Sequence, residues 1–225
     1  MIDRRTLLSL LPLSAAALVA GGCSRTSDRS SEASRYSPMY FTRAEWEFIT
    51  TAVDRLIPQE GEGPGAVAAG VPEFIDRQLE LPYGYGAYFY MQGPFIADAE
   101  PTLGYQLRFT PREIYRLGIA DADALAREQH GNDFSLLTSA QQDELLGRME
   151  HGELQFAHVP AAVFFAQLLQ NTREGYFADP QYGGNRDMMA WRWIGFPGAR
   201  ADFTDWIDRA GSKYLYGPVS IAGNT

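Results

Sequence analysis

The sequence has a single cysteine, Cys23, and only three histidines among its 225 residues. One thiol cannot form a disulfide within the chain, and it cannot supply the several thiolates of a zinc or iron–sulfur site. The Cys-x-x-Cys-His motif of c-type haem attachment is absent, and so are His-Glu-x-x-His, Gly-x-Ser-x-Gly and a complete Gly-x-Gly-x-x-Gly. We therefore predict no catalytic, cofactor-binding or metal-binding residue in this chain.

Basic residues are also in short supply. The chain has 19 Lys and Arg against 28 Asp and Glu, a net charge of −9 and a pI of about 4.8. An acidic surface repels phosphate backbones, so nucleic acid is not expected as a partner, and charge gives no attraction to an anionic membrane surface. A hydrophobic content of 45% is enough to bury one sizeable core.

The first 23 residues are predicted to be an export signal. Arg4 and Arg5 precede an apolar run from Leu7 to Ala20, which is shorter than the roughly 20 residues of a membrane span. A charged start, a short apolar run and a small-residue end are typical of a secretory signal. The arginine pair resembles the twin-arginine signal, whose export machinery carries folded proteins. We therefore expect a periplasmic location; a buried N-terminal helix is the alternative.

Cys23 closes this signal with two outcomes open. Gly21-Gly22-Cys23 resembles the end of a lipoprotein signal, although Ala20 stands where a large aliphatic residue is usual. A lipid on Cys23 would tether the chain to a membrane; otherwise the cysteine is lost with the signal peptide. Residues 24–40 are polar at first and are predicted to be a flexible linker, followed by one domain over 41–225.

The rest of the sequence predicts a mainly α fold. Three threonines, Thr42, Thr110 and Thr138, are each followed three residues later by Glu or Gln, the capping box that starts a helix. Together with apolar spacing they predict about six helices, which begin near residues 43, 71, 111, 139, 160 and 202. Residues 82–109 and 179–198 interrupt this pattern as long irregular insertions rich in aromatic residues, Gly and Pro.

Residues 179–198 form the densest of these stretches, and three interpretations stay open. Arg and Trp enrichment suits a protein–protein contact. Paired glycines and Asn and Asp side chains also suit a loop that packs internally and closes the fold. In the third interpretation, Asp179 and Asp187 with Trp191 and Trp193 serve a stand-alone periplasmic carbohydrate-binding module or hydrolase. A lipoprotein scaffold unrelated to redox chemistry is a further alternative for the whole chain.

Several short motifs, in order, resemble one family. They are Val53-Asp54-Arg55-Leu56-Ile57-Pro58, Gly63-Pro64-Gly65-Ala66, Leu103-Gly104-Tyr105-Gln106, Asn171-Thr172 with Gly175-Tyr176-Phe177, and Asp179-Pro180 through Gly183-Gly184-Asn185-Arg186-Asp187 to Gly195-Phe196-Pro197-Gly198. Their order is similar to that of the gluconate 2-dehydrogenase subunit 3 family, over nearly the whole mature chain.

The resemblance implies a non-catalytic small subunit of a periplasmic sugar or sugar-acid dehydrogenase complex. Its large partner would be a glucose–methanol–choline-type flavoprotein that carries FAD, and a multihaem cytochrome with haem c would often be a third subunit. The small subunit would supply the export signal and assist maturation of the large one. Its docking surface would comprise Tyr85, Tyr88, Tyr182, Gly183, Gly184, Asn185, Arg186, Asp187, Trp191, Phe196 and Pro197.

Overall fold

The computed structural model describes residues 36–96, 99–104 and 106–223. Within this part it has six α-helices, short 3₁₀ turns and no strand, so the mainly α prediction is confirmed. The predicted export signal with Arg4, Arg5 and Cys23 lies outside the described residues, as does most of the predicted linker. No helix among the described residues combines the length and the apolar character needed to cross a membrane.

The three capping boxes start helices as predicted. They precede α1 (Arg43–Leu56), α3 (Pro111–His130) and α4 (Ser139–Glu150). In each, the threonine hydroxyl accepts the backbone N–H three residues on, and the Glu or Gln there accepts the threonine N–H in return. The two bonds satisfy donors that a helix N-terminus leaves without a partner.

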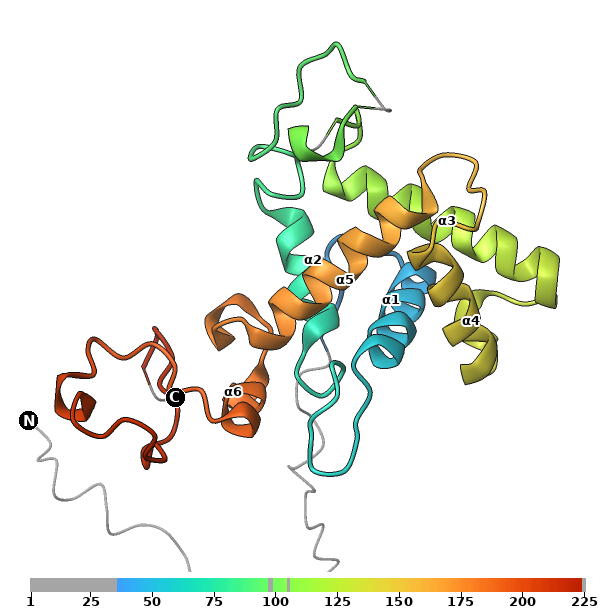
Figure 1. The fold of residues 1–225 in the computed structure, drawn as a ribbon. Helices are drawn as coiled ribbons and strands as arrows, with labels where there is room; N and C mark the ends of the chain where they lie inside the picture. Colours follow the sequence, from blue (N-terminus) through green and yellow to red (C-terminus); the bar gives the residue numbers. More distant parts are fainter. Residues whose placement is uncertain (1–35, 97–98, 105, 224–225) are drawn as a thin grey trace, which may run out of the picture. The chain divides into compact units, whose positions relative to one another are not determined.

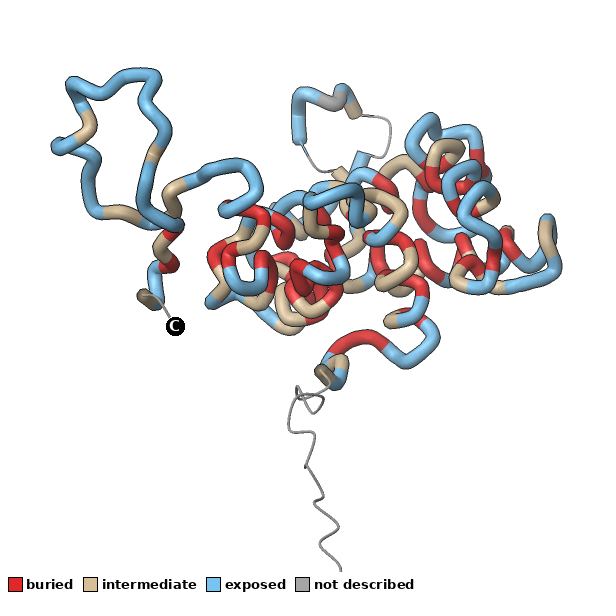
Figure 2. The backbone as a smooth tube through the Cα atoms, turned by 90° about the horizontal axis from the view of Figure 1, so that it is seen from below, coloured by how far each residue is buried: buried red, intermediate tan, exposed pale blue. Residues whose placement is uncertain are grey.

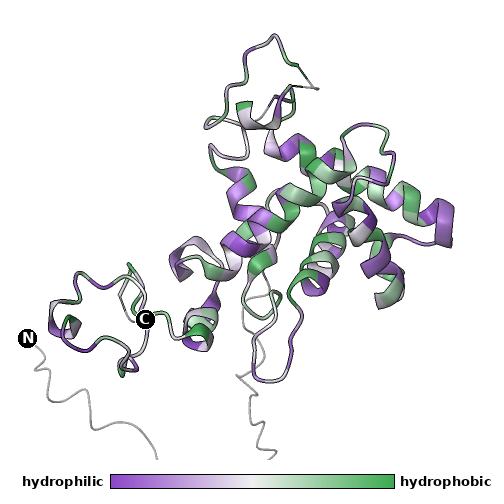
Figure 3. Ribbon diagram, in the orientation of Figure 1, coloured by the Kyte–Doolittle hydropathy of each residue, from purple (hydrophilic) through white to green (hydrophobic). Residues whose placement is uncertain are grey.

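Helix α5 (Ala161–Phe177) is the centre of the bundle. It contacts α2 (Val71–Glu80), α1, α3 and α4 (Figure 1). Its Phe164 and Leu168 are fully buried, with Phe48 of α1 and Ile75 of α2 in the same core. Red buried stretches in Figure 2 follow these helices, and Figure 3 shows apolar residues recurring along them. Burial of one face of each helix against α5 therefore supplies most of the hydrophobic stabilisation.

The chain enters the bundle through a contact with Asp76 of α2. This carboxylate is fully buried and accepts backbone N–H groups of Met39 (2.7 Å), Tyr40 (3.0 Å) and Phe41 (2.9 Å). It also accepts the Tyr36 hydroxyl at 2.7 Å. Burial, together with this carboxylate, raises the pKa of Tyr36 well above its usual value. Asp76 thus fixes the segment that leads into α1.

The sixth helix is not where the sequence predicts it. Residues 202–210 form only a 3₁₀ turn, Thr204–Trp206, so that helix prediction is wrong. Asp202 caps the N–H of Thr204 at 2.9 Å, but the residues that follow are mostly exposed and gain little packing to extend a helix. Instead α6 (Met189–Ile194) lies inside the stretch predicted as loop, between 3₁₀ turns and Gly195.

Candidate docking surface

Asn185 is the structural centre of the 179–198 stretch. Its side chain is fully buried, and its backbone is left-handed with φ of 44°. The amide N–H donates to the carbonyl of Ala178 (2.9 Å), while the amide oxygen accepts the N–H of Ala190 (2.9 Å). Asn185 therefore joins the end of α5 to the start of α6.

The neighbouring residues pack this loop onto α5 and the start of α2. Gly184 is buried, and a Cβ there would lie 2.1 Å from the carbonyl oxygen of Gly175, so no larger residue fits. The N–H of Arg186 donates to the carbonyl of Ala69 (2.9 Å), and its guanidinium pairs with Glu73 at 2.6 Å. The conformation of residues 184–186 is thus fixed by contacts inside the chain.

Asp179 anchors the C-terminal end of the chain. Its buried carboxylate accepts the Ser220 hydroxyl (2.7 Å), the Ile221 N–H (2.7 Å) and the Gln181 N–H (3.2 Å). Burial favours a raised pKa, but these three hydrogen bonds outweigh it and leave the pKa of Asp179 lowered. Its oxygens are therefore engaged in a structural role, while Asp187 is exposed.

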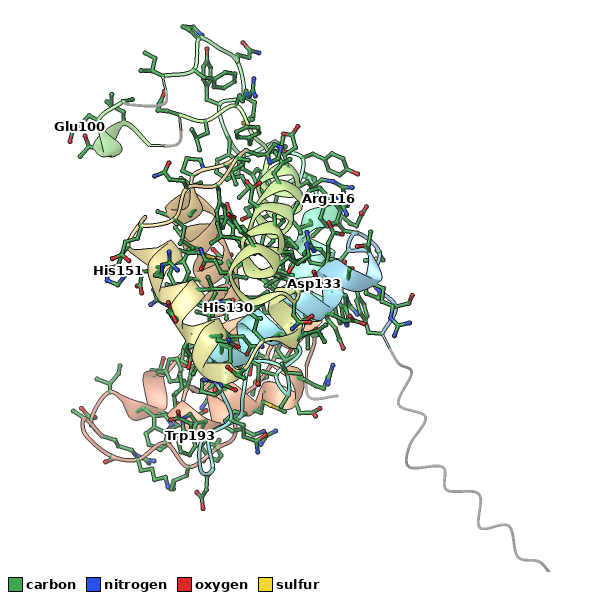
Figure 4. The ribbon with its side chains drawn as sticks, turned by 90° about the vertical axis from the view of Figure 1, so that its right-hand side faces the viewer. Glu100, Arg116, His130, Asp133, His151 and Trp193 are labelled. Atoms are coloured by element: carbon green, nitrogen blue, oxygen red, sulfur yellow. The ribbon has the colours of Figure 1, made fainter. Side chains whose placement is uncertain are left out.

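The two tryptophans of α6 face different surroundings. Trp191 is buried, donates its indole N–H to the carbonyl of Phe177 (2.9 Å) and packs edge-on against Phe196. Trp193 is 53% exposed, is labelled in Figure 4, and lines a cleft of about 500 Å³ with Gly63 and Arg192. Of the two tryptophans on this helix, Trp193 is the one available to a partner.

The start of the insertion after α2 (residues 82–109) is held by contacts with the helices, while Tyr85 and Tyr88 within it are exposed. The guanidinium of Arg112 lies between the rings of Tyr40 (4.3 Å) and Tyr85 (4.4 Å), and it donates to the carbonyl of Leu79 (2.8 Å). Cation–π contacts of this kind hold Tyr85 in place while leaving it exposed. Tyr88 is exposed as well.

A polar network with α3 and α5 also holds Tyr83, at the start of this insertion. The Asn171 amide of α5 donates to the hydroxyl of Tyr83 (3.0 Å) and accepts the hydroxyl of Tyr115 (3.0 Å). Burial raises the pKa of both tyrosines, so both stay neutral and able to donate at physiological pH.

The predicted docking residues therefore divide by exposure. The exposed ones are Tyr85, Tyr88, Tyr182, Arg186, Asp187 and Phe196, whereas Gly183 and Pro197 are partly buried and Gly184, Asn185 and Trp191 are buried. These three buried residues hold the loop in its conformation through contacts inside the chain. A partner that binds here would contact the exposed residues together with Trp193, which is not among the docking residues predicted from the sequence. The sequence gives one indication that Trp193 is exposed where Trp191 is buried, because residues two apart in a helix face different sides.

The three histidines lie apart, each with its own contact. Nδ1 of His130 is 3.2 Å from the Gln141 amide, Nδ1 of His151 is 2.6 Å from the Gly147 carbonyl, and Nδ1 of His158 is 2.6 Å from Asp121. Figure 4 shows His130 and His151 at the ends of separate helices. The described residues contain no group of three or more His, Cys, Asp and Glu side chains placed to hold a metal ion.

Comparison with known proteins agrees with the motifs. The family model of gluconate 2-dehydrogenase subunit 3 matches residues 43–198, from the first residue of α1 to Gly198. No curated protein and no solved structure matches the chain. The match covers more than half of the sequence and includes the loop around Asn185, so the predicted resemblance is confirmed. The chain belongs to the gluconate 2-dehydrogenase subunit 3 family.

Proposed function

We propose that this chain is the non-catalytic small subunit of a periplasmic FAD-dependent sugar or sugar-acid dehydrogenase of the glucose–methanol–choline type. The observation that carries the proposal is the family match over residues 43–198. The FAD belongs to the large subunit, and haem c belongs to a cytochrome subunit where one is present. This chain binds the large subunit, escorts it through export and stabilises it.

Export of a folded complex explains why a chain of this kind carries the signal. FAD is loaded in the cytoplasm, so a flavoprotein that crosses the membrane folded keeps its cofactor. Arg4 and Arg5 supply the twin-arginine signal for both subunits, and Cys23, if lipidated, tethers the complex to the membrane. The large subunit then needs no signal of its own.

The distribution of exposed apolar side chains supports a binding role. Of the 20 large apolar side chains exposed in the described residues, seven lie in residues 81–103 and eight in residues 193–221. Clusters of exposed apolar residues on a soluble domain mark interaction sites. The carbohydrate-site alternative gains no such support, because Trp191 is buried and the carboxylate of Asp179 is engaged by three donors.

The test is purification of the tagged chain from the periplasm of its own host, with an absorption spectrum of the eluate. We expect a co-eluting large subunit with flavin bands. An Arg4→Lys/Arg5→Lys variant should remove both subunits from the periplasm. Arg25→Lys/Arg29→Lys, which makes the same change in the linker, should not. Unchanged periplasmic flavoprotein in the first variant would contradict the export role, and a flavin-free eluate from the unaltered chain would contradict the whole proposal.

A further inference from the structure

Residues 199–218, here called the C-terminal loop, leave the helical part and return to it at one point. The N–H of Ala199 donates to the carbonyl of Val219 (2.7 Å), and the N–H of Val219 donates to the carbonyl of Pro197 (3.2 Å). A Cβ on Gly198 would lie 2.2 Å from the Val219 oxygen, so the two ends of the loop are in backbone contact. The loop begins where the family match ends, at Gly198.

The C-terminal loop has an aromatic cluster of its own. The ring of Tyr214 lies 5.1 Å from that of Trp206, 5.6 Å from Tyr216 and 6.2 Å from Phe203. The guanidinium of Arg200 lies over the Tyr214 ring at 5.5 Å. Ring contacts of this kind hold a loop in one shape before it meets a partner, which lowers the entropy cost of binding.

Large apolar side chains of this loop nevertheless face solvent. Leu215 is 78% exposed, Ile207 73% and Tyr216 61%. Figure 2 shows the loop as an almost continuous exposed stretch next to the C-terminus. The ring contacts leave Tyr216 itself largely exposed and do not cover Ile207 or Leu215, and the indole N–H of Trp206 is buried without an acceptor. The loop by itself therefore leaves apolar surface and one polar group unsatisfied.

The C-terminal loop differs from the rest of the described chain in net charge. The loop carries three basic residues, Arg200, Arg209 and Lys213, and three aspartates, so its net charge is zero. Residues 36–198 carry 11 arginines and 22 acidic residues, a net charge of −11. The acidic parts of two copies of the chain repel one another, and an anionic lipid surface repels the acidic part as well. A second copy and a membrane are both disfavoured as occupants, which leaves a different protein.

We propose that the C-terminal loop docks into an apolar recess of the large dehydrogenase subunit through Ile207, Leu215 and Tyr216, an inference that rests on the proposed function. The net charge of the loop is zero, so apolar contact and not charge would hold it to the partner. The loop lies outside the family-matched residues 43–198, so this contact is separate from any that the matched residues make.

Lys213 gives a direct test, because it is the only lysine in the sequence. In the purified complex, an amine-to-amine cross-linker should join Lys213 to lysines of the large subunit, as mapped by mass spectrometry. Lys213→Arg should abolish those cross-linked peptides. If Lys213 reacts with the reagent at one end only and no link to the large subunit forms, the proposal is overturned.

Affinity gives the second test. Ile207→Ser/Leu215→Ser should weaken binding of the large subunit at least tenfold while leaving the melting temperature of the free chain unchanged. Leu136→Ser removes an equally exposed side chain (70%) from the 3₁₀ turn Phe134–Leu136 and should change the Kd less than twofold. Equal affinity of both variants would overturn the docking role and leave the proposed function standing, whereas absence of any flavoprotein with the unaltered chain would overturn both.

The other occupants are tested with the same double variant. Self-association of the free chain, or binding to vesicles of phosphatidylglycerol and phosphatidylethanolamine, would overturn the proposal if the double variant lost it. We expect the free chain to show neither.

Discussion

Asn185→Ala should destabilise this protein more than any exposed substitution, because one buried side chain joins two helices. The amide of Asn185 satisfies the carbonyl of Ala178 and the N–H of Ala190. Alanine offers neither group, so the buried N–H of Ala190 and the partly buried carbonyl of Ala178 would both lose their hydrogen bond. The backbone at this position also keeps its left-handed conformation, with φ of 44°, which asparagine tolerates better than alanine.

The magnitude follows from these two effects. A buried backbone group left without its partner costs about 1–3 kcal/mol, and two groups are affected here. Left-handed backbone adds about 1 kcal/mol for alanine. The expected loss is about 3–7 kcal/mol, a large fraction of the roughly 5–15 kcal/mol that stabilises a typical domain. For a domain of this size, each kcal/mol lowers the melting temperature by about 2–4 °C.

Circular dichroism melts and urea titrations of the unaltered chain and the variants would measure this loss. Asn185→Gly should recover about 1 kcal/mol of it, since glycine adopts the backbone conformation freely but makes neither hydrogen bond. Asn132→Ala, at an exposed asparagine, should stay within about 0.5 kcal/mol. An Asn185→Ala variant as stable as the Asn132→Ala variant would refute the assignment of Asn185 as the joint between α5 and α6.

Three further predictions concern neighbouring positions. Gly184→Ala should lower the melting temperature by about 5 °C or more, because its Cβ meets a backbone oxygen, whereas Gly147→Ala in the open face of α4 should raise stability by about 0.5–1 kcal/mol. The pKa of Asp179 is below its ordinary value of 3.8, so the carboxylate stabilises the fold fully above about pH 4, and this effect is lost as the pH falls through the lowered folded-state pKa. In the Asp179→Asn variant, the melting temperature should therefore depend less on pH in this range. A pH dependence equal to that of the unaltered chain would contradict this. Trp191→Ala should cost about 3–5 kcal/mol of stability, whereas Trp193→Ala should leave stability nearly unchanged and weaken binding of the large subunit; the reverse pattern in melting and binding assays would show that the two roles are misassigned.

Helix starts could be predicted from the sequence because the signal is local. In each of the boxes at Thr42, Thr110 and Thr138, both hydrogen bonds join residues three apart, so the motif alone specifies the contact. The failure at residues 202–210 has the opposite origin. Asp202 makes its cap, but a short helix needs a covered face, and sequence spacing alone does not tell whether another element covers it.

The sequence showed that residues 179–198 were unusual, but not which side chains would be buried. Three side-by-side elements bury Asn185, Gly184 and Trp191: their own stretch, α5 and the start of α2. Such contacts can join residues more than 100 positions apart in the sequence, as Arg186 and Glu73 do. Of the interpretations left open for this stretch, internal packing accounts for residues 183–186. Docking stays a prediction for the exposed residues around them.

The separation of these two roles has a physical reason. A surface that binds a partner must expose apolar groups, and exposed apolar groups do not hold a fold together, so the two tasks favour different residues. In this chain, buried Asn185 and Trp191 hold the 179–198 stretch in place, whereas the neighbouring Trp193 and the C-terminal loop expose apolar side chains to solvent. Substitutions in the frame should therefore reduce stability and binding together, whereas substitutions at Ile207 or Leu215 should reduce binding alone.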